Sequence, residues 1–273
     1  MLLLHGFPGY WADWERQMQA LAEGGFHVIA PDLPGYGEYG QLPNVRDYAR
    51  EALAADLAGL IRALGLEHAH VIGHDWGGVL AYLLAALHPE LVQRLIIINA
   101  PHPTLMMRAL GHFDQLRRSW YIFLFQLPLL PEWLVHQRAA ISVCLRGMEV
   151  RAGAFSDADV ERYWAAMRVP GVARAALSYY RAAFRSPAWT EYPITQQTLV
   201  LWGEQDQALS ARRLLAGLER YAPKAHVVRF ANAAHWLHHD LPEVVSRHSI
   251  DFLSAPDLDT DKLLKRVWTA GPM

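Results

Sequence analysis

The strongest chemical signal in the sequence is an aspartate flanked by glycines, Asp75, in the segment GHDWGG at positions 73–78. This segment directly follows the apolar run HVI at positions 70–72. Glycines two positions before and two positions after a central residue are typical of a nucleophile elbow, in which a strand turns sharply into a helix. The alternative interpretation is an ordinary glycine-rich turn whose aspartate caps the helix.

An aspartate at such an elbow indicates a particular kind of reaction. A carboxylate with an ordinary pKa of about 4 is ionised at neutral pH and needs no base to become a nucleophile. Its attack on a saturated carbon gives an alkyl ester of Asp75, which water can hydrolyse at the carbonyl, whereas a serine would leave an ether. We therefore expect cleavage of a carbon–oxygen or carbon–halogen bond, and we do not expect an esterase or a peptidase.

Hydrolysis of that ester needs a base, and the best candidate is His235, which follows the last apolar run of the chain. Asp206 lies just beyond another apolar run, where its carboxylate could fix the tautomer of His235 and stabilise the imidazolium. Asp75, Asp206 and His235 then follow the nucleophile, acid, base order of the α/β-hydrolase fold. Glu204 is the second candidate for the acid, whereas Asn99, at the competing acid position, cannot serve.

The same histidine region admits a different interpretation, because His238, His239 and Asp240 lie close to His235 in the sequence. Histidine and aspartate are common metal ligands. The helical HExxH spacing is missing, however, so we predict no metal and no cofactor.

The tetrahedral intermediate of ester hydrolysis carries an oxyanion that needs two hydrogen-bond donors. One would be the backbone N–H of Trp76, the residue after the nucleophile. The other would come from the loop after the first strand, HGFPG at positions 5–9, where we expect the N–H of Phe7 to donate. A plain Gly-Pro turn leaving a strand is the simpler interpretation of that loop.

Several short apolar runs bounded by turn residues must position these groups, and they are typical of strands buried on both faces. The expected strands are 2–5, 27–32, 69–75, 95–100, 198–203 and 226–231. Helical patterns separate most of them, for example over 48–64, where Gly65 supplies the stop. Strands and helices in alternation predict an α/β fold with a mostly parallel central sheet flanked by helices.

One interval of nearly a hundred residues between two expected strands contains no clear strand and is rich in aromatic residues, arginine and alanine. An unstructured loop of that length is improbable, so we expect a helical unit inserted at the carboxyl edge of the sheet. The predicted division is a core of residues 1–100 and 198–255, a helical cap of residues 101–197, and a C-terminal tail of residues 256–273 that is helical or disordered.

Composition excludes several classes of partner. The 273 residues are 52% hydrophobic and carry a net charge of −2, which gives no footprint for nucleic acid or for a membrane surface. The nearest approach to a membrane span, 120–135, is too short and is interrupted by prolines. A single cysteine forms no internal bridge, and without a basic leader we expect a cytoplasmic protein, monomeric or homodimeric.

Five motifs in order resemble the epoxide hydrolases of the α/β-hydrolase superfamily: HGFPG at 5–9, DLPGYG at 32–37, GHDWGG at 73–78, WGEQD ending at Asp206, and AHW around His235. The resemblance covers the chain from residue 2 to about residue 253. It implies a sheet of about eight strands with a helical cap, a two-step mechanism through an aspartyl ester, and a small apolar epoxide and water as substrates.

The resemblance also implies two cap tyrosines that donate hydrogen bonds to the epoxide oxygen. Matching YIFLFQLP at 121–128 gives Tyr121, and matching the second Tyr-Arg pair gives Tyr180, with Tyr179 as the alternative. The departing alkoxide is a strong base that must be protonated, which gives such donors a chemical reason. The simpler interpretation is that aromatic residues of the cap pack as core.

The chain departs from the family at three places. It starts inside the first motif strand, where the family has two further strands. Pro34 stands where arginine is common, and Tyr39 where a small residue is common. The last two positions border the expected mouth of the site, so substrate preference stays open.

Two alternative functions remain. A haloalkane dehalogenase would use the same aspartate, histidine and acid, with Trp76 holding the halide, although that family has asparagine where Phe7 stands and gives paired tyrosines no role. Fluoroacetate dehalogenases have arginine at the position of Trp76. A binding protein without activity on a hydrolase scaffold is the third possibility.

Overall fold

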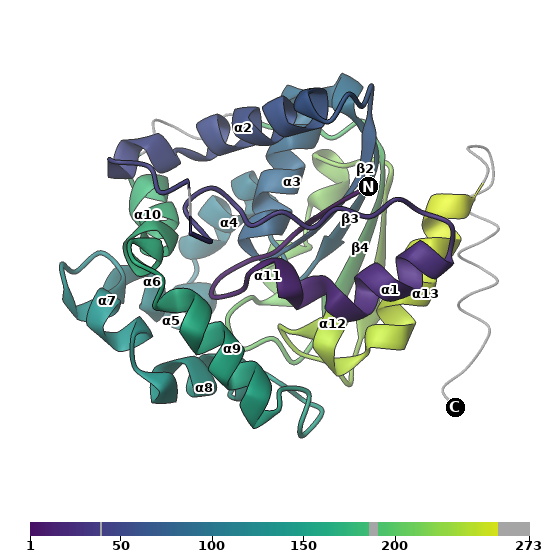
Figure 1. The fold of residues 1–273 in the computed structure, drawn as a ribbon. Helices are drawn as coiled ribbons and strands as arrows, with labels where there is room; N and C mark the ends of the chain where they lie inside the picture. The colour runs from purple at the N-terminus through teal and green to yellow at the C-terminus, as the bar shows by residue number, and fades with distance from the viewer. Residues whose placement is uncertain (39, 186–190, 256–273) are drawn as a thin grey trace.

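The computed structural model describes residues 1–38, 40–185 and 191–255, and Figure 1 shows a parallel sheet with helices on both faces. Its five strands are β1 (Leu2–Leu4), β2 (Ala69–His74), β3 (Val92–Ile98), β4 (Gln197–Gly203) and β5 (Ala225–Phe230). They lie side by side in chain order, and every neighbouring pair is parallel. The predicted α/β fold with a parallel central sheet flanked by helices is therefore confirmed, although the described residues form five strands and not the eight that the family resemblance implies.

The prediction of a strand over residues 27–32 is wrong. Ile29 forms a single parallel bridge with Leu2, in which the Leu3 N–H donates to the Ile29 carbonyl at 2.9 Å. The segment meets only the short outer edge of β1, and Pro31 has no N–H with which to continue a ladder. Pairing therefore stops after one residue, and the chain turns away toward Pro34.

The strands alternate their side chains between two buried layers, which explains why they are apolar almost throughout. Leu3, Ile72 and Ile96 belong to the layer shared with α1 (Glu15–Glu23) and α13 (Pro242–Ser254). Side chains of the opposite parity face α2 (Arg50–Ala63) and α3 (Trp76–Leu87). The helix expected over 48–64 corresponds to α2, and Gly65, with φ +71°, follows its end.

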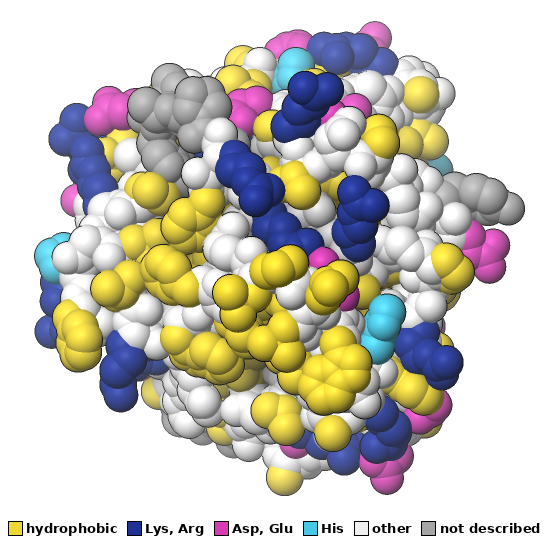
Figure 2. Space-filling model, turned by 90° about the vertical axis from the view of Figure 1, so that its left-hand side faces the viewer, with side chains coloured by type: hydrophobic (Ala, Val, Ile, Leu, Met, Phe, Trp, Pro, Cys, Tyr) yellow, Lys and Arg dark blue, Asp and Glu magenta, His cyan; other side chains and the backbone are white. Residues whose placement is uncertain are grey.

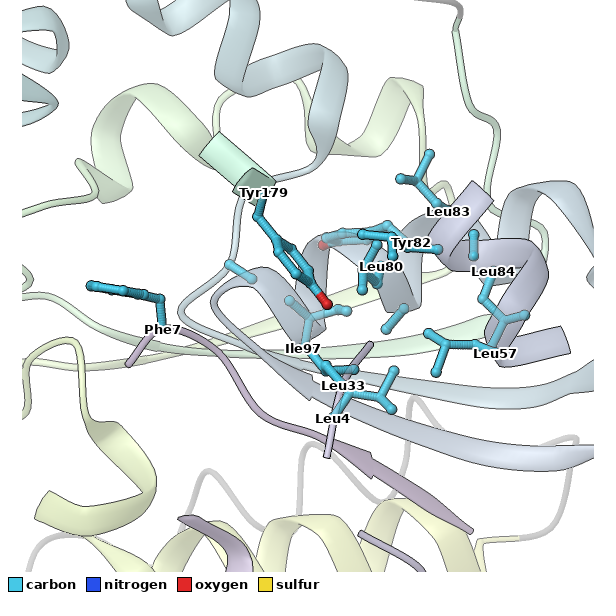
Figure 3. Close-up of a cluster of buried hydrophobic side chains, with 14 of the residues drawn as sticks. Leu4, Phe7, Leu33, Leu57, Leu80, Tyr82, Leu83, Leu84, Ile97 and Tyr179 are labelled. Atoms are coloured by element: carbon cyan, nitrogen blue, oxygen red, sulfur yellow. The ribbon is translucent and has the colours of Figure 1, made fainter. Parts of the chain in front are cut away.

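The chain between β3 and β4 forms seven helices in its described part, which we call the inserted helices. They are α4 (Pro103–Leu110), α5 (Phe113–Arg118), α6 (Trp120–Leu124), α7 (Leu130–Val135), α8 (Arg138–Arg146), α9 (Asp157–Met167) and α10 (Val172–Ala183). Figure 1 shows them gathered together at one side of the sheet. Figure 3 shows Tyr179 of α10 reaching the buried cluster that contains Leu80 and Ile97.

The remaining elements are short. They are η1 (Trp11–Trp14), η2 (Val45–Tyr48), η3 (Pro89–Leu91), α11 (Ala211–Leu214), η4 (Leu218–Arg220) and α12 (Leu237–Asp240). In residues 1–38, 40–185 and 191–255, no helix combines the length and the apolar character needed to cross a membrane. The expected tail 256–273 and Tyr39 lie outside the described residues.

Candidate active site

Asp75 occupies a sharp turn between β2 and α3. Its backbone has φ 50° and ψ −120°, which residues with a side chain rarely adopt. The flanking glycines are required by close backbone approach: a Cβ on Gly73 would lie 2.4 Å from the Gly77 carbonyl oxygen, and one on Gly77 would lie 2.1 Å from that of Leu4. The turn therefore presents Asp75 from the carboxyl end of the sheet because glycine alone fits beside it.

Backbone donors hold the Asp75 carboxylate. The Phe7 N–H donates to Oδ1 at 2.9 Å, and the Trp76 N–H also hydrogen-bonds this carboxylate. Burial raises the pKa of Asp75, while His235 and the two N–H groups oppose that rise because they favour the charged form. The two predicted oxyanion donors thus both contact Asp75.

His235 lies between Asp75, the predicted nucleophile, and Asp206, the predicted acid. Its Nδ1 is 2.8 Å from Oδ2 of Asp206, and its Nε2 is 3.8 Å from Oδ2 of Asp75. Burial on its own would lower the pKa of His235, but the negative charge and hydrogen bond of Asp206, together with the charge of Asp75, raise it to about 8. The structure brings together Asp75, Asp206 and His235 from three different loops.

Asp206 is fixed by four donors. Its Oδ1 accepts the N–H groups of Ala208 and Leu209, each at 2.8 Å, and its Oδ2 accepts the Asn99 side-chain N–H at 2.8 Å in addition to His235. Glu204, the second candidate for the acid, instead pairs with Arg229 at 2.7 Å and does not join His235. Asp206 therefore takes the position beside His235.

Sequence reasoning excluded Asn99 as the acid and missed what it does. Its backbone has φ 40°, and its side-chain oxygen accepts the Gly203 N–H at 2.9 Å. Because that bond fixes which end of the amide carries oxygen, the NH₂ end must point at Asp206. The signal available in the sequence was an asparagine, tolerant of positive φ, directly after an apolar strand.

His5 is a second residue that the sequence analysis did not single out. Its Nε2 accepts the Leu33 N–H at 3.0 Å, so its Nδ1 carries the proton and donates to the Gly6 carbonyl at 3.0 Å. Burial lowers the pKa of His5 and favours this neutral form. The ring therefore holds the loop from which Phe7 donates to Asp75.

A cavity of about 320 Å³ lies above Asp75 and is lined mostly by apolar side chains of the inserted helices. Asp75, Trp76, Tyr121 and Tyr180 all line it. The Tyr180 ring packs edge-on against Trp76 at 5.1 Å, and the Tyr121 ring centre lies 6.0 Å from that of Tyr180. The cavity therefore places a carboxylate and two phenols within one enclosure.

The charge of Asp75 acts on the hydroxyl pKa values of Tyr121 and Tyr180, the two cavity tyrosines. Burial raises the pKa of both hydroxyls well above the ordinary value, and the charge of Asp75 adds to this rise. Tyr180 also receives a side-chain hydrogen bond from Trp76. Tyr179, the alternative at the second position, instead donates its hydroxyl to the Pro34 carbonyl at 2.8 Å and does not line the cavity.

The cavity reaches the surface at an apolar face of the inserted helices. Two of its lining residues, Met107 and Phe184, are exposed, and the Phe184 ring packs against exposed Phe123 at 5.7 Å. Figure 2 shows apolar side chains gathered on this side of the molecule, where α6, α7 and α10 lie in Figure 1. An apolar compound can therefore approach the cavity along an apolar surface.

The histidines after His235 lie behind the site. His238 and His239 gather around Asp13 of η1, and not around Asp240, their neighbour in the sequence. The Asp240 carboxylate accepts the backbone N–H groups of Val150, Arg151 and Ala234, which occupy both of its oxygens. Burial and neighbouring histidines lower the pKa of His238 well below its ordinary value, so its ring is neutral.

Comparison with known proteins gives the same fold over most of the chain. Residues 1–242 match the family described as alpha/beta hydrolase fold. The AB hydrolase superfamily protein YfhM of Bacillus subtilis (strain 168) is 37% identical over 257 residues, which are 93% of this chain and 89% of that protein. Epoxide hydrolase 3 of Xenopus tropicalis is 37% identical over 263 residues, 93% of this chain and 71% of that protein.

Solved structures of epoxide hydrolases superpose on most of this chain. The Bacillus megaterium epoxide hydrolase, solved in complex with an inhibitor, superposes with a TM-score of 0.84 at 29% identity and covers 93% of each chain. The epoxide hydrolase VrEH1 from Vigna radiata superposes with a TM-score of 0.79 at 27% identity, over 92% of this chain and 90% of that one.

Proposed function

The chain belongs to the epoxide hydrolase family of α/β-hydrolase-fold enzymes, and we propose that it converts a small apolar epoxide and water into a vicinal diol through an ester on Asp75. The observation that carries this proposal is the shared cavity, in which Asp75 lies in one enclosure with Tyr121 and Tyr180. In this proposal residues 101–197 act as a cap over the core of residues 1–100 and 198–255, and the reaction needs no metal or cofactor.

The first step is attack by Oδ2 of Asp75 on an epoxide carbon. This is the oxygen on the His235 side, since Oδ1 already accepts the Phe7 N–H. A carbon–oxygen bond forms to Asp75, and the epoxide carbon–oxygen bond breaks with its electron pair passing to the ring oxygen. The hydroxyls of Tyr121 and Tyr180 hydrogen-bond this oxygen, and one of them gives it a proton.

The charge of Asp75 couples this proton transfer to ester formation. In the resting enzyme the Asp75 carboxylate helps to keep the pKa of both tyrosines high, so they hold their protons. Esterification removes that negative charge as the alkoxide appears. The tyrosines therefore become better acids at the stage of the reaction where an acid is required.

The second step is hydrolysis of the ester. Water attacks the ester carbonyl carbon while Nε2 of His235 takes a proton, and Asp206 stabilises the imidazolium through Nδ1. The N–H groups of Phe7 and Trp76 stabilise the oxyanion. Collapse expels the diol oxygen, which His235 protonates, and the further proton released on restoring the Asp75 carboxylate returns to the tyrosinate.

The same loss of charge prepares the base. Asp75 is one of the groups that raise the pKa of His235 to about 8, so its esterification lowers that pKa and frees Nε2 to accept a proton. The arrangement thus favours protonated His235 before the first step. After esterification the imidazolium releases its proton to solvent, so that neutral Nε2 serves as the base in the second step, and it regains a proton from solvent once the Asp75 carboxylate is restored.

Haloalkane dehalogenation is the alternative reaction for the same residues. Trp76 lines the cavity, where its ring could contact a departing halide. A halide needs no proton, however, so a dehalogenase would leave Tyr121 and Tyr180 without a role. This difference separates the two reactions experimentally, and binding without turnover is the outcome expected of a non-catalytic relative.

The test is to trap the ester. His235→Gln is mixed with styrene oxide and analysed as intact protein by mass spectrometry, and peptide mapping locates the added mass. We expect an adduct of one epoxide on Asp75 that persists for hours, because no base activates water. Asp75→Asn in the same background is the matched control and should show no adduct. An adduct with bromoalkanes alone would favour the dehalogenase, and none with either compound would refute both enzymes.

A further inference from the structure

Asp13 and His238 form a buried polar cluster whose groups the proposed reaction does not use directly. Asp13, from η1, is only 1% exposed, and its ion-pair partners in the described part of the chain are His238 and His239 of α12. Oδ2 of Asp13 and both ring nitrogens of His238 are buried without a hydrogen-bond partner among the described residues. Folded proteins rarely leave buried polar atoms in this state, and a bound ion can satisfy them.

The ligand atoms of the cluster converge. Nε2 of His239 lies 3.1 Å from Oδ1 of Asp13, Nε2 of His238 lies 3.9 Å from the same oxygen, and one ligand atom from each residue falls within 4.8 Å of the others. Ligands about 2.0–2.1 Å from a tetrahedral ion are about 3.4 Å apart. Small side-chain rotations would therefore bring all three atoms to a common centre.

Neighbouring groups already orient the three side chains as ligands. Trp14 stacks on the His238 ring at 4.8 Å, and Phe155 lies over the His239 ring at 4.4 Å. Tyr163 of α9 donates its hydroxyl to Asp13, and this hydroxyl lies 3.4 Å from Nε2 of His239. The Tyr163 hydrogen bond is the kind of outer contact that holds a metal-binding carboxylate in place, and the two aromatic rings restrict the imidazole rings by packing.

We propose that Asp13, His238 and His239 bind one divalent transition-metal ion, with Zn²⁺ as the reference ion. Two imidazoles and one carboxylate suit zinc and its neighbours in the first transition series, whereas Mg²⁺ and Ca²⁺ prefer oxygen ligands. Water completes the coordination, while Tyr163 keeps its hydrogen bond to Asp13. His239 is the least buried of the three, so an ion would enter on its side.

The site would act on structure and on the electrostatics of the base, not as a reagent. It joins η1 and α12 of the sheet-bearing part to α9 of the inserted helices through Tyr163. It also lies close behind the active site, because the His238 ring is 4.5 Å from His74, which in turn is 4.8 Å from His235. A bound cation would offset the charge of Asp13, which is one of the groups that act on His235.

The test uses full-length protein without an affinity tag, dialysed against a chelator and then titrated with ZnCl₂ by calorimetry. We expect one Zn²⁺ per chain, no binding of Mg²⁺, and visible absorption bands of tetrahedral Co²⁺ when CoCl₂ replaces zinc. Asp13→Asn and His238→Gln should each weaken Zn²⁺ binding by about 100-fold or more, since even outer contacts of metal sites contribute 10–100-fold. His68→Gln, which removes an exposed histidine, is the matched control and should bind as the wild type does.

Two outcomes would overturn the proposal. If wild-type protein binds no ion, the cluster is a hydrogen-bonded network only. If His238→Gln binds Zn²⁺ as tightly as the wild type, the ion binds elsewhere. His239→Gln keeps the test decisive should the more buried variants fail to fold, because its partly exposed ring can be replaced with little repacking, and its far-UV circular dichroism without metal checks the fold.

Discussion

Replacing Asp206 by asparagine separates the two proposed steps, because it changes the tautomer of His235 and leaves Asp75 in place. Oδ1 of Asp206 accepts two backbone N–H groups, so the amide oxygen of the variant would stay on that side and its NH₂ would take the place of Oδ2. That NH₂ faces Nδ1 of His235, which must then accept a hydrogen bond. The proton moves to Nε2, the atom that should take one from water.

Rotation of the new amide does not relieve the problem, because it would turn the NH₂ toward the backbone N–H groups of Ala208 and Leu209. Without rotation, the NH₂ of the variant meets a second donor. The Asn99 NH₂ also points at this position and is held there by the bond from the Gly203 N–H to the Asn99 oxygen. The variant therefore opposes two donors at a buried position, which costs about 1–3 kcal/mol of stability. Losing the charge of Asp206 also removes its contribution to the pKa of His235, so that pKa falls from about 8.

We expect a fall in the rate of ester hydrolysis of about 10⁴-fold, the effect of an equivalent change in a serine protease triad, while alkylation of Asp75 changes by less than about tenfold. Rapid-quench mixing with styrene oxide followed by mass spectrometry measures the two rates separately. Glu204→Gln, in the same loop, is the control and should behave as the wild type. Equal slowing of both steps, or hydrolysis slowed by less than tenfold, would refute the role given to Asp206.

Three further predictions follow from the same geometry. Tyr180→Phe should slow alkylation by epoxides by about 10²-fold or more while sparing any bromoalkane reaction, and Tyr179→Phe should leave alkylation nearly unchanged; rapid-quench rates with both substrates check this. Because His235 has its folded pKa raised to about 8 from 6.5, its stabilising contribution is complete below pH 6.5 and is lost as pH rises through 8. The contribution is about 2 kcal/mol, and urea unfolding of wild type and His235→Gln at pH 6 and pH 9 should show it as the change in their difference. Gly77→Ala should destabilise the fold by several kcal/mol, seen as a lowered midpoint of thermal unfolding, since its Cβ would meet the Leu4 carbonyl carbon and oxygen, which cannot move without breaking β1.

The sequence predicted that the polar groups after buried strands lie close together, because the carboxyl ends of parallel strands meet at one edge of a sheet. Asp75, Asp206 and His235 each follow such a strand, so their convergence needed no knowledge of side-chain packing. Asp206 and Glu204 lie only two positions apart in the sequence. The turn after β4 directs Asp206, and not Glu204, toward His235. Tyr121 and Tyr180 came from family resemblance, since nothing in helix periodicity separates a cavity tyrosine from a core one.

What the sequence could not predict depends on contacts between distant loops. Asn99 reaches Asp206 only because the ends of β3 and β4 are adjacent. Its amide can donate to Asp206 because its oxygen faces the Gly203 N–H. Asp13 is more than two hundred positions from His238 and has no spacing signature with it. The strand expected over 27–32 failed for a similar reason, because its apolar pattern was correct but its pairing partner was only three residues long.

In the proposed reaction one negative charge acts on three other groups, in addition to burial and to the contacts of Asp206. The Asp75 carboxylate raises the pKa of Tyr121, Tyr180 and His235 while it is free. The proposed conversion of Asp75 to a neutral ester would remove its contribution from all three values, which would make the tyrosines better acids and His235 a better base. A permanent neutral ester mimic at Asp75, such as Asp75→Asn, should therefore lower the pKa of His235 below about 8, and NMR titration of its ring proton measures this. An unchanged His235 pKa in that variant would show that the charge of Asp75 does not act on His235 and that the two steps are not coupled through charge.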